Sequence, residues 1–205
     1  MASRSRKNGS RRSLGLRTAY GISSSWKRRH PQQRRHCRGC RSIQRGLRVR
    51  EGAQLPLARV IVSSCLLGAD VRYHGGSARI ESPILRRWQE QGRVVGLCPE
   101  VAAGLGTPRS AAESVRGDGA RVLAGAAAVI TSDGRYVTDA FLAGAEHAVA
   151  MAQALRIRVA VLKTRSPSCG TGEIYDGSFS GRLVRGTGVT AAALQRAGVQ
   201  VFNEA

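Results

Sequence analysis

The stretch Val60-Ile61-Val62-Ser63-Ser64-Cys65-Leu66-Leu67-Gly68 is the part of the sequence from which the fold is best predicted. It opens with three β-branched apolar residues and two serines come next, a pattern typical of a short buried strand in a parallel sheet. Similar apolar runs predict three further strands, over residues 94–97, 159–162 and 199–202.

Helices are predicted between these strands. Pro83 suits the first turn of a helix over 82–91. Apolar residues at helical spacing predict a long helix from Thr138, as its N-cap, to about Leu155. A last helix is predicted over 190–197. Strands that alternate with helices predict an α/β fold, a single domain with a mainly parallel sheet flanked by helices in Rossmann-like layers.

The segments between these elements carry shorter patterns. Residues 121–123 and 127–131 predict one or two short strands around Gly125, and residues 178–184 predict another. Gly186-Thr187-Gly188 predicts a tight turn into the last helix. The longer string Gly186–Ala191 also fits a loose dinucleotide-binding pattern, but the chain ends too soon for the rest of such a domain.

The charge of this 205-residue chain is concentrated near its start. Its formal net charge is +20, and residues 1–58 contribute +15, with 16 Lys or Arg and a single acid, Glu51. Residues 1–56 are Arg- and Ser-rich with no sustained apolar pattern, so they are predicted to form a disordered basic arm. The domain is predicted to span residues 57–205. The total charge therefore does not indicate a nucleic-acid partner for the whole protein.

Four origins of this arm remain open. It could bind RNA or DNA, or direct the chain to an organelle. A twin-arginine export signal around Ser10-Arg11-Arg12 is disfavoured because Arg17 and Lys27 interrupt the apolar segment that such a signal needs. The interpretation we favour is upstream sequence translated from a misplaced start, with the native protein beginning near Leu57. No apolar run is long enough to span a membrane, and five widely spaced cysteines fit a reduced, cytoplasmic location better than a disulfide framework.

Three cysteines come after predicted strands in equivalent places. Cys65 comes after the first strand, Cys98 after the second, and Cys169 a few residues after the strand over 159–162. Ligands gather at the carboxyl ends of parallel strands, so these thiols are expected to converge. A single such cysteine is more often an inert core thiol. Three together favour a functional site, although their spacing does not name the metal.

Several motifs, in order along residues 58–205, resemble those of the thiouracil desulfidase-like family, also called domain of unknown function 523. They are Val62–Gly68, Val71–Gly76, Cys98–Val101, Gly104–Arg109, Lys163–Gly170, Ile174–Gly181, Gly188–Thr190 and Val199–Phe202. The basic arm has no part in the resemblance. One departure is His74, where the family usually has an acidic or amide residue after the tyrosine.

The resemblance implies an enzyme with a 4Fe-4S cluster held by Cys65, Cys98 and Cys169. Three ligands leave one iron open, and this iron would act as a Lewis acid on the sulfur of a thiocarbonyl such as 2-thiouracil. The implied reaction replaces sulfur by the oxygen of water, with no net redox change. Glu100, beside Cys98, is the first candidate for the acid–base role. The other catalytic candidates are Ser166, Ser168 and Lys163, and the substrate-binding candidates are Arg165, Tyr73, His74 and Asp176.

Other interpretations stay open. Each candidate residue taken alone is as readily a loop or capping residue. The same cluster could transfer sulfur to a nucleoside, or the protein could bind nucleic acid through residues 1–56. Cys37 and Cys40, with His30 and His36 upstream, resemble half of a zinc site that has no second half. His147, inside the long predicted helix, is expected to be structural. The oligomeric state is left undetermined.

Overall fold

A four-stranded parallel sheet forms the centre of the computed structural model, which describes residues 57–205. The strand order is β2-β1-β5-β8, and every neighbouring pair runs parallel. The predicted fold class is therefore confirmed, and so are the four predicted core strands to within one residue. Their bounds are Val60–Ser63 for β1, Val94–Leu97 for β2, Val159–Leu162 for β5 and Gln200–Asn203 for β8.

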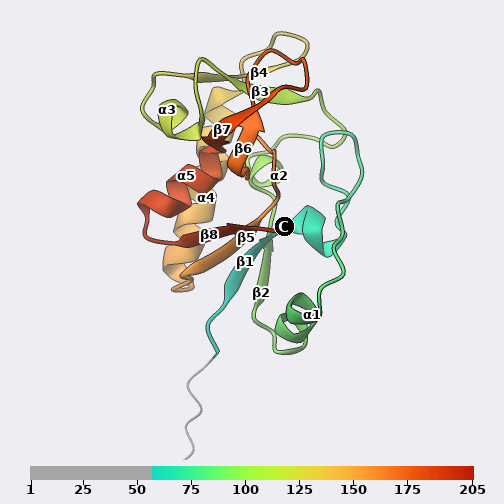
Figure 1. Ribbon diagram of the computed structural model, residues 1–205. Helices are drawn as coiled ribbons and strands as arrows, with labels where there is room; N and C mark the ends of the chain where they lie inside the picture. Colours follow the sequence, from blue (N-terminus) through green and yellow to red (C-terminus); the bar gives the residue numbers. More distant parts are fainter. Residues whose placement is uncertain (1–56) are drawn as a thin grey trace, which may run out of the picture. The chain divides into compact units, whose positions relative to one another are not determined.

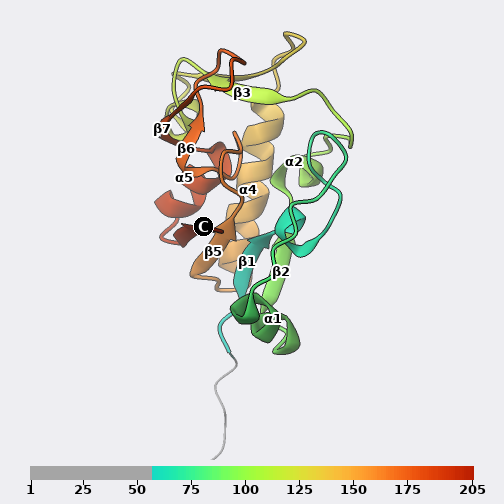
Figure 2. The same ribbon diagram turned by 45° about the vertical axis from the view of Figure 1, so that its right-hand side comes forward.

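Helices cover both faces of this sheet (Figures 1 and 2). Successive residues of a strand point to opposite faces, so Ile61 packs on one side while Val60 and Val62 pack on the other. The Ile61 face is covered by α4 (Thr138–Ala154) and α5 (Val189–Arg196). The opposite face is covered by the 3-10 turn η1 (Ser64–Leu67) and α1 (Pro83–Glu90), chiefly through Leu66 and Leu85.

The three predicted helices are confirmed as α1, α4 and α5, with one correction at the start of α4. Ser82 caps α1 by accepting the Leu85 N–H. In α4 the prediction that Thr138 is the N-cap is wrong, because Val137 occupies that position. The Thr138 hydroxyl instead accepts the Val129 N–H at 3.0 Å, which ties the helix to a neighbouring strand. Hydrogen bonding to another element has overridden the local capping preference of threonine.

Two antiparallel strands lie beside the amino-terminal half of α4. They are β3 (Ala112–Val115) and β4 (Ala128–Thr131), and the second confirms the strand predicted over 127–131. The strand predicted over 121–123 is wrong, since these residues belong to α3 (Gly119–Leu123). Asp118 caps α3 by accepting the Arg121 N–H, so the helix starts where the apolar run alone indicated a strand.

A second antiparallel pair, β6 (Thr171–Tyr175) and β7 (Leu183–Thr187), forms a hairpin beyond β5. The prediction of a strand over 178–184 is wrong for most of its length, because residues 176–182 form the turn between the two strands. Gly186 and Thr187 lie within β7 rather than in the predicted turn, because both pair with β6. Figure 2 shows the hairpin next to β3, beyond the carboxyl ends of the parallel strands.

The remaining short helix, α2 (Pro99–Ala102), starts directly after β2 and packs on α4. The division into a basic arm over 1–56 and one domain over 57–205 stays a prediction, and residues 1–56 lie outside the described part. Within residues 57–205, no helix has the length and apolar character needed to cross a membrane.

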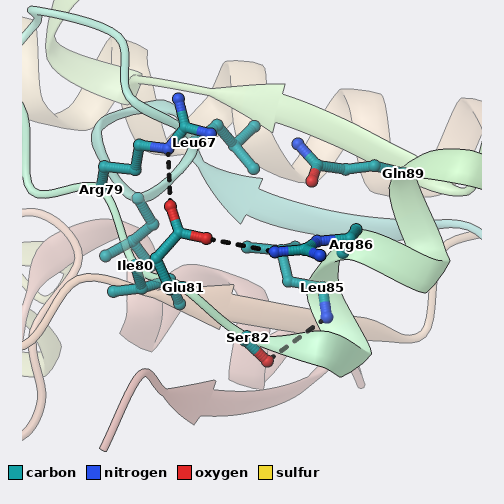
Figure 3. Close-up of a pocket in the computed structure, with 9 residues that line it drawn as sticks. Leu67, Arg79, Ile80, Glu81, Ser82, Leu85, Arg86 and Gln89 are labelled. Atoms are coloured by element: carbon teal, nitrogen blue, oxygen red, sulfur yellow. Dashed lines mark hydrogen bonds and ion pairs between the residues drawn. The ribbon is translucent and has the colours of Figure 1, made fainter.

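A small cavity of about 120 Å³ lies between η1 and α1 (Figure 3). Glu81 forms ion pairs there with Arg79 at 3.2 Å and Arg86 at 3.5 Å. All three side chains are roughly 70% exposed, so these pairs contribute little to stability. None of the candidate site residues lines this cavity.

Candidate functional site

The three cysteines predicted to converge line a single cavity of about 600 Å³. Cys65 lies in η1, directly after β1, and Cys98 lies between β2 and α2. Cys169 lies in the turn between β5 and β6. All three are free thiols. Because β2, β1 and β5 are adjacent in the sheet, their carboxyl ends bring these three side chains to the same crevice.

The turn that carries Cys169 is held against the start of α5. Thr190 donates its N–H to Ser168 O at 2.9 Å, and Gly188 donates its N–H to Gly170 O at 2.8 Å. A Cβ on Gly188 would stand 2.4 Å from the Ser168 carbonyl, so only glycine permits this approach. The glycine after β7 therefore has a structural reason, which is to let two backbone segments meet behind the cysteine.

Burial raises the pKa of all three thiols. It is the largest cause at Cys65, Cys98 and Cys169, and the closeness of Cys98 raises the pKa of Cys65 further. Lys163 and Arg72 act in the opposite direction on Cys65. The thiols are therefore neutral without a partner, whereas thiolates are favoured once a cationic metal group enters the cavity.

The donor set fits a cluster better than a single ion. Within residues 57–205, no group of three or more His, Cys, Asp or Glu side chains is arranged to hold a metal ion. A cluster needs a looser arrangement, because each thiolate binds a different iron and the sulfurs stand farther apart. Three free thiols, which are all the cysteines of residues 57–205, around a cavity of this size fit an iron–sulfur cluster.

Glu100, the candidate acid–base residue, lines the same cavity and is held by Arg109. Nε and Nη2 of Arg109 donate to the same carboxylate oxygen, Oε2, at 2.9 and 2.7 Å. Both side chains are mostly buried. Within the described residues the second oxygen of Glu100, Oε1, has no hydrogen-bonding partner. Arg109 belongs to the family-like motif Gly104–Arg109, but no local pattern in that motif predicts that it pairs with Glu100.

Arg109 also fixes the loop that follows η1 and lines the cavity through Val71, Arg72 and Tyr73. Its Nη2 donates to Val71 O at 3.1 Å, and its backbone N–H donates to Tyr73 O at 2.7 Å. The third guanidinium nitrogen donates to Gly106 O and to Thr107 Oγ1. One side chain therefore connects Glu100, the Val71–Tyr73 loop and its own loop.

Lys163 lines the cavity and pairs with Glu204, close to the end of the chain. The Glu204 carboxylate also accepts the backbone N–H and the hydroxyl of Thr164, each at 2.8 Å. Burial alone would raise the pKa of Glu204, but hydrogen bonds from Lys163 and Thr164 hold this pKa below its ordinary value. The sequence offered no signal for Glu204, because a residue 41 positions from Lys163 meets it only through the pairing of β5 with β8.

The two serine candidates have different positions. Ser166 lines the cavity, and its Oγ accepts the N–H groups of Ser168 at 3.2 Å and Cys169 at 3.1 Å. Ser168 is fully buried, does not line the cavity, and shares a hydrogen bond of 2.9 Å with Thr190 Oγ1. Ser168 therefore contacts Thr190 in the core and does not face the cavity where a substrate would bind.

The four substrate-binding candidates divide in the same way. Tyr73 and Arg165 line the cavity. His74 does not line it, and its ring meets the Tyr73 ring edge to face at 5.1 Å. Asp176 lies outside as well and accepts the N–H of Ser178 within the β6–β7 turn. The structure therefore brings five of the eight non-cysteine candidates to the cavity, namely Glu100, Lys163, Ser166, Arg165 and Tyr73.

Glu113 is a buried acid at the cavity that sequence reasoning missed. It lies in the middle of β3 and accepts the N–H groups of Gly177 at 2.9 Å and Phe179 at 3.0 Å. Phe179 lines the cavity too. An acid inside the four-residue run Ala112–Val115 carries no pattern that predicts burial, so the sequence held no usable signal. The zinc-ligand candidates Cys37 and Cys40, with His30 and His36, lie outside the described residues.

Comparisons with known proteins agree with this geometry. The family model of 2-thiouracil desulfurase matches residues 60–205. The uncharacterized protein YbbK of Bacillus subtilis (strain 168) is 42% identical over 145 residues, which are 71% of this chain and 95% of YbbK. The solved structure of the 4Fe-4S-dependent thiouracil desulfidase TudS is similar with a TM-score of 0.65 and 46% identity, and the match covers 72% of this chain and 91% of that one.

Proposed function

We propose that this chain, which belongs to the 2-thiouracil desulfurase family, removes sulfur from 2-thiouracil or a closely related thiolated pyrimidine at an iron–sulfur cluster held by Cys65, Cys98 and Cys169. The observation that carries the proposal is the convergence of these free thiols, from the ends of three adjacent strands, on a cavity that Glu100 also lines. The likeness to a 4Fe-4S-dependent thiouracil desulfidase supports both the cofactor and the substrate class.

The reaction is a hydrolysis. A thiocarbonyl compound and one water give the carbonyl compound and hydrogen sulfide. The carbon–sulfur bond breaks with its electron pair on sulfur, and the water oxygen becomes the carbonyl oxygen. The water protons end on the departing sulfide, so no oxidant or reductant is required. When bound by three thiolates, the cluster supplies one open iron as a Lewis acid for the sulfur.

Glu100 accepts the proton of the attacking water. Arg109 occupies one carboxylate oxygen with two hydrogen bonds, which leaves Oε1 for the water. A positioned carboxylate of this kind contributes about 10²–10⁴-fold to the rate of a hydrolysis. Glu100 lies in α2, two residues after Cys98, and this closeness in sequence supports its assignment as a base beside the proposed cluster.

The cations and hydroxyls at the cavity position the heterocycle. Lys163, fixed by Glu204 and Thr164, presents an ammonium group, and Arg165 adds a second, more exposed cation. Ser166 fixes the backbone before Cys169. Tyr73 contributes an aromatic wall. Ser168, His74 and Asp176 have no contact with the substrate in this proposal, because none of them lines the cavity.

The test is turnover of 2-thiouracil by the full-length protein, loaded with its cluster without oxygen and supplied with no reductant. We expect uracil and sulfide in equal amounts, with oxygen from labelled water in the uracil. A requirement for an electron donor would contradict the proposal. So would sulfur recovered in a thiolated nucleoside, in place of free sulfide, when a nucleoside acceptor is present.

A further inference from the structure

The turn between β6 and β7 is fastened to β3 by a buried carboxylate that the proposed hydrolysis does not use. Glu113 is 8% exposed, and a single oxygen, Oε2, accepts the N–H groups of Gly177 at 2.9 Å and Phe179 at 3.0 Å. Hydrogen bonds from two amides to a carboxylate are stronger than those to a neutral acceptor. Glu113 therefore sets the conformation of a distant turn, because Gly177 and Phe179 lie 64 and 66 residues further along the chain.

Direct backbone packing holds the same turn. Gly177 has φ +88°, and a Cβ there would stand 2.5 Å from the Ser114 carbonyl oxygen. Within the turn, the Asp176 carboxylate accepts the Ser178 N–H at 3.0 Å. The turn is thus attached to β3 by backbone contact as well as by Glu113, which leaves little freedom to the residues after Gly177.

Phe179 is the residue that these contacts place at the cavity. It lines the cavity and keeps 39% of its surface exposed. Its φ is +57°, a left-handed conformation that is uncommon for an aromatic residue. Such a conformation persists only where the surroundings impose it, and the bond from its own N–H to Glu113 is part of that constraint.

We propose that Phe179 selects flat, unsaturated rings as substrates and that Glu113 is the positioning residue that holds Phe179 at the cavity. The inference rests on the proposed function and adds the residue that recognises the ring. The face of an aromatic side chain stacks on a pyrimidine, whereas a ring with two saturated carbons is puckered and stacks poorly.

The other aromatic residues at the cavity fit this role less well. The Tyr73 ring meets His74 edge to face, so its orientation is set by that contact. Tyr175 is half-buried in β6, where it pairs with Leu183. Phe179 carries no polar group, lines the cavity from the turn rather than from a strand, and keeps 39% of its surface exposed, so we assign the contact with the heterocycle to its ring.

The experiment compares kcat/KM for 2-thiouracil with that for 5,6-dihydro-2-thiouracil, whose ring is puckered, using the full-length cluster-loaded protein. We expect the wild type to prefer the flat ring. In Phe179→Leu this preference falls about tenfold, mainly through a higher KM for 2-thiouracil, because one stacking contact is lost. Phe179→Tyr should keep the preference for the flat ring, because tyrosine retains an aromatic face. Tyr136→Leu, at an exposed aromatic residue that does not line the cavity, is the matched control.

Glu113 is tested in the same assay. Glu113→Ala is expected to lower the preference as Phe179→Leu does, and the double variant should show no further fall, because both changes remove one contact. Glu113→Gln keeps an acceptor oxygen and should retain most of the preference. The midpoint of thermal unfolding shows whether Glu113→Ala is folded. If Glu113→Ala is unfolded, the preference of Glu113→Gln is compared with that of the wild type in its place.

The outcomes separate the inference from the function on which it rests. An active wild type whose preference survives in Phe179→Leu would overturn the role of Phe179 and leave the proposed function standing. A fall in Phe179→Leu without a fall in either Glu113 variant would overturn the positioning role alone. A cluster-loaded wild type that turns over neither compound would overturn the proposed function, and the inference with it.

Discussion

Arg109 gives two hydrogen bonds, from Nε at 2.9 Å and from Nη2 at 2.7 Å, to one oxygen of Glu100 and none to the other. The pair lies at the cavity that Cys65, Cys98 and Cys169 share. A carboxylate that is fixed through one oxygen keeps its direction, while its second oxygen remains able to accept a proton. This asymmetry is the geometric basis for assigning the base to Glu100.

The first prediction concerns this pair. Glu100→Gln should lower kcat for 2-thiouracil by at least about 100-fold, because the amide cannot accept the water proton. Arg109→Lys should lower it by about tenfold, since an ammonium group cannot make both bonds. Iron content per chain, measured beside kcat, should stay at the wild-type level in both variants. Glu90→Gln, at an exposed acid of α1, is the control. A Glu100→Gln variant with wild-type kcat would remove the assigned base.

The two serines before Cys169 should respond differently. Ser166→Ala removes the acceptor of two N–H groups in the Cys169 turn, so iron content and kcat should fall together. Ser168→Ala removes a buried bond to Thr190 and should lower the free energy of unfolding by about 1 kcal/mol, with a much smaller effect on kcat. Iron analysis, kcat and urea unfolding of both variants check this. The reverse pattern, with kcat lost only in Ser168→Ala, would contradict the geometry.

Glu204 predicts a dependence of stability on pH. Its pKa is lowered in the folded chain, so its contribution to stability is fully present above its ordinary pKa of 4.5 and is lost as the pH falls through the lowered value. The free energy of unfolding of the wild type should therefore exceed that of Glu204→Gln at pH 7. The difference should shrink below about pH 4.5. Glu146→Gln, at an exposed acid of α4, should show no such trend. A difference that grows as the pH falls would contradict the assignment.

Removal of residues 1–56 should leave desulfuration intact, because within residues 57–205 the cavity is lined by residues from both ends of the domain, from Ser63 to Gly181, and the proposed reaction uses only these. The kcat of residues 57–205 is compared with that of the full chain, each loaded with its cluster. If the basic arm binds nucleic acid, salt-dependent binding should disappear with it while turnover continues. Loss of turnover with iron retained would show that the arm has a part in the reaction.

The sequence predicted the elements whose apolar residues form continuous runs. β1 is buried throughout and β5 is buried or half-buried along its length, while β2, at the edge of the sheet, buries only Leu97; the apolar residues of all three strands still identify them without reference to any partner. The motifs at their ends placed the three cysteines, which is why the metal ligands could be proposed before the fold was known. Local patterns sufficed because each of these features lies within a few consecutive residues.

The rest depended on contacts between distant residues. β3 contains Glu113 and Ser114, and only its pairing with β4 and its bonds to the β6–β7 turn account for a strand there. Thr138 was expected to cap a helix, but a bond to Val129 uses its side chain. The pairings of Arg109 with Glu100 and of Glu204 with Lys163 are likewise long-range or cross a loop. No local pattern encodes such contacts, since each partner is an ordinary residue in its own stretch of sequence and only the fold brings the two together.

The central claim is that Cys65, Cys98 and Cys169 hold an iron–sulfur cluster, and iron and sulfide content per chain tests it most directly. The full-length wild type and single cysteine-to-alanine variants are reconstituted without oxygen, with Cys37→Ala and Cys40→Ala as matched controls. We predict about four irons and about four sulfides in the wild type and in both controls, as a 4Fe-4S cluster requires, and a sharp fall in each of the three cavity variants. Wild-type iron and sulfide in any cavity variant, or zinc in place of iron in the wild type, would contradict the claim.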